Sequence, residues 1–146
     1  MPFQDDPHLI RWRLHLDSSP VAIYEFLTTN EGRARFWAES AVEEEGHINF
    51  RFPNGLEWRA KILQQQPPTH FSLNYFDSTS SFELNEDGAG GTDLVLIDDG
   101  VPLEYREEII AGWVSVLMAL KAAADFNIDL RNHDPDRTWD QGFCNN

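Results

Sequence analysis

The side chains that could perform chemistry are few and widely spaced in this sequence. Its histidines are His8, His15, His47, His70 and His133. None of them is spaced so that two imidazoles share one face of a helix, and the single cysteine, Cys144, has no second thiol with which to hold zinc. The pattern therefore predicts neither a metal site nor a cofactor.

Three other motifs look catalytic but lack the required context. Ser115 lies inside a helix-like run rather than in a Gly-x-Ser-x-Gly elbow, so no hydrolase nucleophile is expected. The glycine-rich stretch 88–91 lies between two strand-like segments and lacks the lysine of a phosphate-binding loop, which predicts a hairpin turn. Asp98 and Asp99 would point to opposite faces of a strand, and they indicate a solvated turn. No catalytic residue is identified.

The best polar candidate for a binding site is Tyr75, which has the same parity as Phe71 and Leu73 in a strand-like segment. A phenol inside an apolar cleft can orient a ligand through one hydrogen bond. It can equally be a core tyrosine whose hydroxyl reaches solvent, and both interpretations stay open. His70 and Asn74 lie on the other parity of the same segment.

Aromatic side chains make up 12% of the sequence, enough either to line a cavity or to fill a solid core. Each buried ring contributes on the order of 2–3 kcal/mol in both cases, so abundance alone does not decide. We favour a cavity, because a long helix over a curved sheet often leaves a gap. The predicted ligand-contacting residues are Phe36, Trp37, Phe50, Trp58, Tyr75, Phe82, Trp113 and Leu117.

Hydrophobic periodicity predicts the elements that position these residues. Residues 8–16 alternate between apolar and polar as in a half-buried strand, and Pro20 follows capping side chains at the start of a short helix. A second short helix is expected over 30–37. Further strands are expected near 40–45, 47–52, 56–64, 70–76, 79–86 and 92–98, separated by turn residues. Their short spacing predicts an antiparallel meander.

The last predicted element is a long helix over residues 102–126. Ile109, Trp113, Leu117 and Leu120 fall on one broad apolar stripe, which must cover the sheet that precedes it. This arrangement is an α+β fold in which a C-terminal helix lies across a curved antiparallel sheet.

The register of one hairpin follows from parity. Apolar residues before and after Asn54-Gly55 all carry even numbers, and a two-residue loop would put the two sets on opposite faces. A three-residue loop over 53–55 instead pairs Phe52 with Leu56 and Phe50 with Trp58. We predict the three-residue loop.

Composition bounds the class of protein. The 146 residues fit one domain, and 25 acidic against 11 basic residues give a formal charge of −14. Such a field disfavours nucleic acid and anionic membranes, although a local basic patch around Arg33 and Arg35 stays open. With one cysteine, no N-terminal leader pattern and no apolar run approaching ~20 residues, a cytoplasmic protein is expected.

The order of these elements resembles the helix-grip fold of START lipid-transfer domains and birch-pollen-allergen-like proteins, the SRPBCC superfamily. The sequence also contains Val21–Thr28, Glu31-Gly32 and Phe36-Trp37 near the N-terminus, and Gly112-Trp113, Leu117, Leu120 and Lys121 in the long helix. These motifs resemble the branch named after the activator of the heat-shock protein 90 ATPase.

This resemblance spans residues 8–128 and implies a curved antiparallel sheet of six to seven strands wrapped on the C-terminal helix. Two short helices would follow the first strand, and an apolar cavity would lie between helix and sheet. Residues 1–130 would form a single START-like domain, followed by an extended polar tail over 131–146. The co-chaperones that give the branch its name carry a separate ATPase-stimulating domain, for which this chain has no room, and the family shares no catalytic residues.

Three functions are compatible with these observations. The first is binding of an apolar or aromatic small molecule between helix and sheet, with Phe36 and Trp37 shielding it. The second is an enzyme of the cyclase or dehydratase type, with Tyr75, His70 or Glu57 as acid and base. The third is a protein-interaction or chaperone-associated module, which includes a homodimer.

Overall fold

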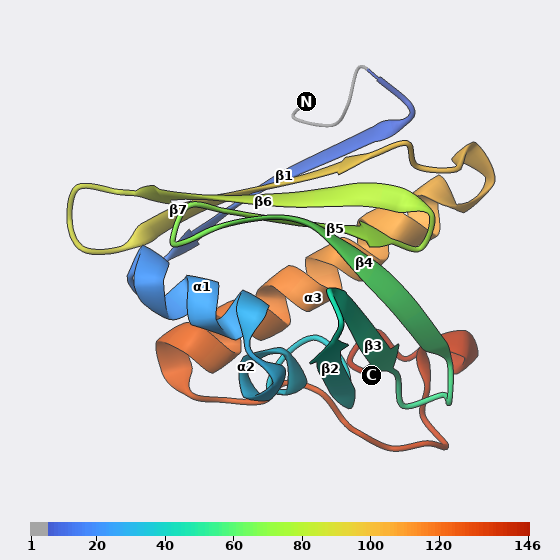
Figure 1. Ribbon diagram of the computed structural model, residues 1–146. Helices are drawn as coiled ribbons and strands as arrows, with labels where there is room; N and C mark the ends of the chain where they lie inside the picture. Colours follow the sequence, from blue (N-terminus) through green and yellow to red (C-terminus); the bar gives the residue numbers. More distant parts are fainter. Residues whose placement is uncertain (1–5) are drawn as a thin grey trace.

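A curved antiparallel sheet lies against a long helix in the computed structural model, which describes residues 6–146 (Figure 1). Within that part of the chain, seven strands are ordered β1-β7-β6-β5-β4-β3-β2. The strands are β1 (Leu9–Leu16), β2 (Ser40–Glu44), β3 (His47–Arg51), β4 (Glu57–Gln66), β5 (His70–Tyr75), β6 (Ser78–Glu86) and β7 (Thr92–Asp99). The helices are α1 (Pro20–Thr28), α2 (Asn30–Ala34) and α3 (Arg106–Phe126), with 3-10 turns at Leu103–Tyr105 and Trp139–Gln141. The predicted α+β architecture is confirmed.

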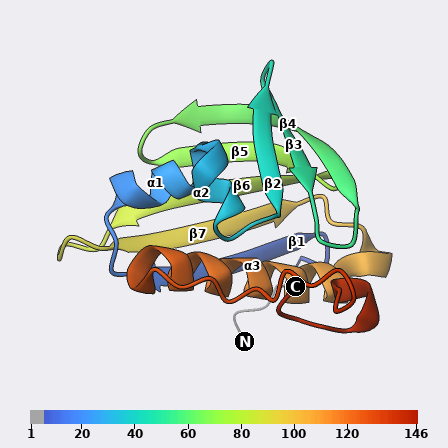
Figure 2. The ribbon, with the colours of Figure 1, turned by 90° about the horizontal axis from the view of Figure 1, so that it is seen from below.

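The first strand extends the meander at one edge, because β1 pairs with β7 along its whole length, from Leu9 opposite Asp99 to Leu16 opposite Thr92. Alternation in β1 sends Ile10 and Leu16 into the core, as the sequence predicts. Viewed from below, α3 runs beneath β1 and β7, while α1 and α2 occupy the same concave side of the sheet (Figure 2).

The β3–β4 hairpin has the predicted three-residue loop. Phe50 lies opposite Trp58, and the Phe52 amide donates to the Leu56 carbonyl at 2.9 Å. Gly55 takes a φ of +83°, a conformation that glycine adopts without steric cost. The glycine-rich stretch is also the predicted turn, since it joins β6 to β7.

The sheet bends in the middle of β4. Ile62 lies opposite Leu73 and Gln64 opposite Ser72, so Leu63 is an extra residue in a β-bulge. A bulge increases the local twist and turns the strand. The first half of β4 thereby pairs with β3 and its second half with β5, and the sheet curls around α3.

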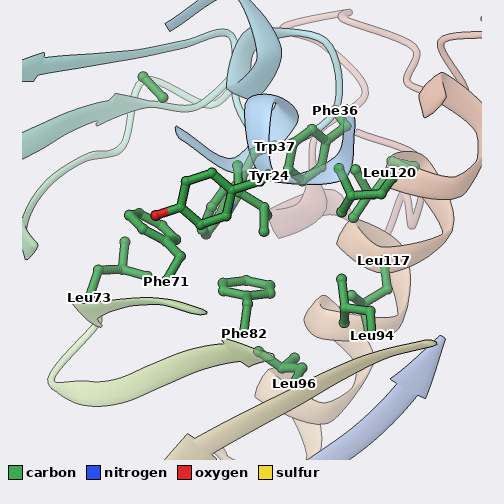
Figure 3. Close-up of a cluster of buried hydrophobic side chains, with 14 of the residues drawn as sticks. Tyr24, Phe36, Trp37, Phe71, Leu73, Phe82, Leu94, Leu96, Leu117 and Leu120 are labelled. Carbon is green, nitrogen blue, oxygen red and sulfur yellow. The ribbon is translucent and has the colours of Figure 1, made fainter. Parts of the chain in front are cut away.

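The core lies in the concavity between the sheet and α3. Phe82, Leu94 and Leu96 point from the sheet toward Leu117 and Leu120 on α3 (Figure 3). Phe36, Trp37, Tyr24, Phe71 and Leu73 complete the labelled cluster. The apolar stripe of α3 therefore covers the sheet, as predicted.

By length and composition, the segment Leu103–Phe126 would be able to cross a membrane, because an 18-residue window has a mean hydropathy of 1.6. This finding differs from the expectation that no apolar run approaches ~20 residues. A core helix that covers a sheet meets the same criterion, and Trp113, Leu117 and Leu120 are buried against the sheet.

Arg33 is fully buried, which contradicts the suggestion of a basic patch around Arg33 and Arg35. Its guanidinium donates to the carbonyls of Ala41 and Leu27 at 3.0 and 3.2 Å and to Asn30 Oδ1 at 2.8 Å. Helix α2 also ends at Ala34, earlier than predicted. Arg33 therefore fastens the short helices to β2 instead of presenting a charge to solvent.

Residues 131–146 fold back along α3 rather than extending away from it (Figure 2). Arg131 donates to the carbonyls of Ala38 and Ala34 at 2.8 and 2.7 Å, and Ser115 Oγ donates to the Cys144 carbonyl at 2.8 Å. The expectation of an extended tail is corrected by these contacts. Polar composition misled the prediction, because the tail is held mainly through hydrogen bonds.

The end of α3 is fastened to the start of α1 through one buried carboxylate. Asp125 accepts hydrogen bonds from the Asp17 and Ser18 amides, from Ser18 Oγ and from Lys121 Nζ, at 2.7–3.0 Å. Burial alone would raise the pKa of the Asp125 carboxyl, but these donors outweigh it and lower the pKa to about 2.

We expect Asp125→Asn to destabilise the fold by about 2 kcal/mol at neutral pH, because a charged acceptor of several hydrogen bonds is lost. Because the pKa of Asp125 is lower in the folded state than in the unfolded state, its carboxylate stabilises the fold at pH values above the unfolded pKa near 3.8. This stabilisation is lost as the pH falls toward 2. Urea titrations at several pH values should show the difference between the two proteins disappearing over that interval. The exposed control Asp136→Asn should change the free energy of unfolding little. A stability difference between Asp125→Asn and the unmodified protein that persisted at pH 2 would contradict this account.

Candidate functional site

A cavity of about 450 Å³ lies between the first half of α3 and the end of the sheet where the β3–β4 and β5–β6 hairpins turn. Residues from the 3-10 turn before α3 and from the C-terminal tail complete its lining. Its size is that of a small-molecule site, and aromatic and aliphatic side chains dominate its wall.

Three aromatic rings from different elements form the inner wall. Trp37 follows α2, Tyr75 ends β5 and Trp113 lies on α3. The ring centroids are 5.4 Å apart for Trp37 and Tyr75, 5.4 Å for Tyr75 and Trp113, and 6.1 Å for Trp37 and Trp113. The rings meet at inclined angles, so each supports the others and their orientation is fixed. Trp37 Nε1 donates to the Tyr75 hydroxyl at 3.2 Å.

A buried carboxylate lies beside this wall. Asp98, near the end of β7, is 1% exposed and lines the cavity. Its Oδ1 accepts hydrogen bonds from Ser78 Oγ at 2.5 Å and Ser80 Oγ at 2.9 Å, and its Oδ2 accepts one from Trp113 Nε1 at 2.8 Å. The antiparallel register places Ser80 directly opposite Asp98. Strands β6 and β7 and helix α3 thus meet at one acidic group.

Burial changes the pKa values of the two polar groups on the inner wall, Asp98 and Tyr75. It raises the pKa of the Asp98 carboxyl above its ordinary value, although the donors from Ser78, Trp113 and Ser80 oppose the shift. It also raises the pKa of the Tyr75 phenol, with the hydrogen bond from Trp37 acting against it and the charge of Asp98 adding to it. Tyr75 therefore stays a neutral phenol through the physiological range.

The turn between β5 and β6 brings Ser78 next to Tyr75. Its two central residues, Phe76 and Asp77, have φ values of +47° and +65°, as a type I′ turn requires. Such a conformation is unfavourable for a bulky residue like Phe76. Both residues line the cavity, and the Phe76 ring stacks on Trp58 at 5.0 Å, which holds the turn in place.

The C-terminal tail forms the outer rim. Trp139 Nε1 donates to Glu108 Oε1 at 3.0 Å, and Asn54 Nδ2 donates to Asp140 Oδ2 at 2.7 Å. These bonds join the tail to α3 and to the β3–β4 loop, and all four residues line the cavity. The tail is consequently part of the site, which polar composition alone did not reveal.

The structure divides the eight predicted ligand-contacting residues into two groups. Trp37, Tyr75 and Trp113 line the cavity. The remaining five do not, and these are Phe36, Phe50, Trp58, Phe82 and Leu117. Phe36, Phe50, Phe82 and Leu117 are buried in the core, and Trp58 packs outside the lining against Phe76. Parity identifies the face of a sheet, but it does not say where on that face the helix leaves a gap.

Of the acid–base candidates, Tyr75 lines the cavity whereas His70 and Glu57 do not. His70 lies at the far end of β5, with Nε2 3.8 Å from Glu83, and Glu57 is exposed. Asp98 was predicted to lie in a solvated turn, whereas it is buried and lines the cavity. Leu94, Leu96 and Asp98 share one parity, so the alternation of the strand carried the signal that Asp98 faces the core.

This fold and cavity define a helix-grip protein of the START-like class. The sequence matches the family described as Activator of Hsp90 ATPase homolog 1-like protein over residues 17–125. The chain therefore belongs to this family, as the resemblance of its motifs predicts. A comparison with curated proteins gives no significant match.

Solved structures share the fold at low sequence identity. A protein of Staphylococcus saprophyticus superposes with a TM-score of 0.73 at 19% identity, over 84% of this chain and 96% of the other. The Aha1 dimer of Colwellia psychrerythraea gives 0.72 at 21% identity, over 81% and 96%. A protein of unknown function from Enterococcus faecalis gives 0.72 at 22% identity, over 82% and 72%. These similarities confirm the helix-grip fold.

Proposed function

We propose that this protein binds a small apolar or aromatic molecule in the cavity between α3 and the sheet. The supporting observation is that one apolar cavity of about 450 Å³ holds a rigid aromatic wall and two polar groups, Tyr75 and Asp98, at a single place. Ligand sites commonly combine a large apolar surface with a few fixed polar groups that orient the ligand. Binding of this kind requires no covalent step. We also propose that the protein is cytoplasmic.

Gly112 gives a direct test of this proposal. It lines the cavity from α3, and a Cβ added there would meet no atom within 4 Å. A larger side chain would therefore extend into the cavity without a clash. Because glycine is about 1 kcal/mol worse than alanine inside a helix, substitution there should also stabilise the fold.

The purified protein would be incubated with a lipid and metabolite extract, and the compounds that co-purify would be identified by mass spectrometry. We expect the unmodified protein and Gly112→Ala to retain the same compounds, and Gly112→Leu to lose them while remaining folded. Equal retention by the leucine variant, or no retained compound in any of the three proteins, would contradict binding in this cavity.

An enzymatic alternative is favoured by one observation, the presence of Asp98 beside Tyr75 in the same cavity. A carboxyl with a raised pKa and a neutral phenol are groups that can transfer protons to or from a bound substrate. Tyr75 keeps the role expected from the sequence, whereas Asp98 replaces His70 and Glu57 in this alternative. Turnover of a retained compound that Asp98→Asn abolishes would support it.

Self-association is the interaction alternative. Val114 and Met118 on the outward side of α3 are 40% and 47% exposed, and the similar Colwellia psychrerythraea protein is described as a dimer. Light scattering of the purified protein would decide, and a strictly monomeric mass across the accessible concentration range would count against a homodimer.

A further inference from the structure

We infer that the molecule held in this cavity is an organic cation, an apolar or aromatic amine whose ammonium group lies against Asp98 and the aromatic wall. This inference rests on the proposed binding function and adds the chemical class of the ligand. It follows from the charges of the lining, from the hydrogen bonds already made there, and from the aromatic surface.

The charged side chains that line the cavity are all acidic. They are Asp77, Asp98, Glu108 and Asp140, and the lining residues in the described part of the chain include no Lys, Arg or His. None of the four forms an ion pair with a cationic side chain among residues 6–146. Asp98, Glu108 and Asp140 accept hydrogen bonds from neutral donors, such as the Trp139 indole for Glu108 and the Asn54 amide for Asp140. The negative charge around this cavity is therefore uncompensated by the protein.

Four of the side-chain donors at the inner wall are already used within the protein, whereas the Tyr75 hydroxyl accepts one hydrogen bond and keeps its own O–H as a donor. The hydroxyls of Ser78 and Ser80 and the indole of Trp113 all donate to Asp98, and the indole of Trp37 donates to Tyr75. A carboxylate or phosphate entering here would find none of these four donors free. In contrast, Asp98 Oδ2 accepts a single hydrogen bond, and a carboxylate oxygen has two lone pairs. An ammonium group supplies the donor that this oxygen lacks.

The aromatic surface favours the same class of ligand. Seven of the lining residues are Phe, Tyr or Trp, and the electron-rich face of such a ring attracts a cation, most strongly for Trp. In a partly desolvated cavity this attraction adds to that of the carboxylate. The formal charge of −14 also raises the local concentration of cations and repels anions.

The test uses three ligands that share a phenyl ring and a four-carbon chain and differ in the terminal group: phenylbutylamine, phenylbutanol and phenylbutyrate. Isothermal titration calorimetry at neutral pH and low salt would measure their affinities. We expect the amine to bind at least about tenfold more tightly than the alcohol, as a charge-assisted hydrogen bond in a desolvated site predicts, and the carboxylate to bind most weakly.

Two isosteric substitutions locate the effect. Asp98→Asn should remove most of the preference for the amine over the alcohol, leaving less than about threefold. Asp99→Asn makes the same change of charge at the exposed neighbouring residue, so it should leave the preference within about twofold of the unmodified protein. If Asp98→Asn does not fold, the ligand series on the unmodified protein still decides between cation and anion.

The outcomes separate the inference from the proposed function. If the alcohol binds but the amine binds no better, or if the carboxylate binds best, the cavity takes an apolar ligand and the cation inference is wrong. If both substitutions lower the preference equally, the attraction comes from the general field of the protein and not from Asp98, which also overturns the inference. Failure of all three ligands to bind at millimolar concentration would contradict the proposed function itself.

Discussion

Replacing Trp113 by alanine should destabilise the protein by about 3–5 kcal/mol, because a fully buried indole leaves a large void in the core. Trp113 is 3% exposed and contacts the rings of Trp37, Tyr75 and Phe82 at centroid distances of 5.4–6.1 Å. Its loss also removes one donor from the buried carboxylate of Asp98. Urea unfolding followed by circular dichroism would measure the change.

Two further variants show which part of the Trp113 side chain matters. Trp113→Phe keeps a ring but lacks the indole N–H, so its loss of stability should be about half that of the alanine variant. Val114→Ala truncates the next residue of the same helix, which is 40% exposed, and should change stability by less than about 0.5 kcal/mol. A change of under 1 kcal/mol for Trp113→Ala would mean that α3 is not packed on the sheet as described.

Arg33→Ala should cost about 3–5 kcal/mol, for a different physical reason. The guanidinium is 0% exposed and satisfies two backbone carbonyls and the side chain of Asn30. Truncation leaves the carbonyls of Ala41 and Leu27 without this donor, whereas Asn30 Oδ1 keeps the hydrogen bond from the Glu43 amide. It also opens a void between the short helices and β2. Burial lowers the pKa of Arg33, while Glu43 and Glu31 act against that shift, so the group remains a cation whose hydrogen bonds hold it in the interior.

The matched control for Arg33 is Arg59→Ala, which removes an exposed guanidinium that donates to Asn49 at 3.0 Å on the sheet surface. Exposed polar pairs of this kind contribute little, so a change of less than about 1 kcal/mol is expected. Thermal unfolding of both variants beside the unmodified protein would make the comparison. Equal small losses of stability in the two variants would show that the two carbonyl acceptors of Arg33 find other donors.

Most of the fold was predictable from the sequence, because its elements have strong periodic patterns. The alternation in β1, the parity around Asn54-Gly55 and the apolar stripe of α3 each depend on local geometry that few alternatives satisfy. The bulge at Leu63 was not predicted, since an extra residue in a strand changes neither composition nor hydrophobicity. Arg33 was misjudged because its partners are backbone carbonyls, which no sequence pattern displays.

The candidate site was predictable only in part. Trp37, Tyr75 and Trp113 line the cavity, and they were predicted as ligand contacts because they are large and lie on predicted core faces. Asp98 was missed because charged residues at the end of a strand are usually solvated, and the hydroxyls that stabilise it come from another strand. The tail was missed for a related reason, since it is held by hydrogen bonds, one donated by Asn54 to Asp140 and one accepted by Glu108 from Trp139, and not by hydrophobic burial.

The positions of the tryptophans make intrinsic fluorescence a reporter of ligand binding. Three of the five tryptophans, Trp37, Trp113 and Trp139, line the cavity, two on the inner wall and one on the rim. Any molecule that enters must displace water from these indoles or contact them directly. The intrinsic emission of the protein should therefore change in wavelength or intensity on occupancy, so compound libraries can be screened without a label.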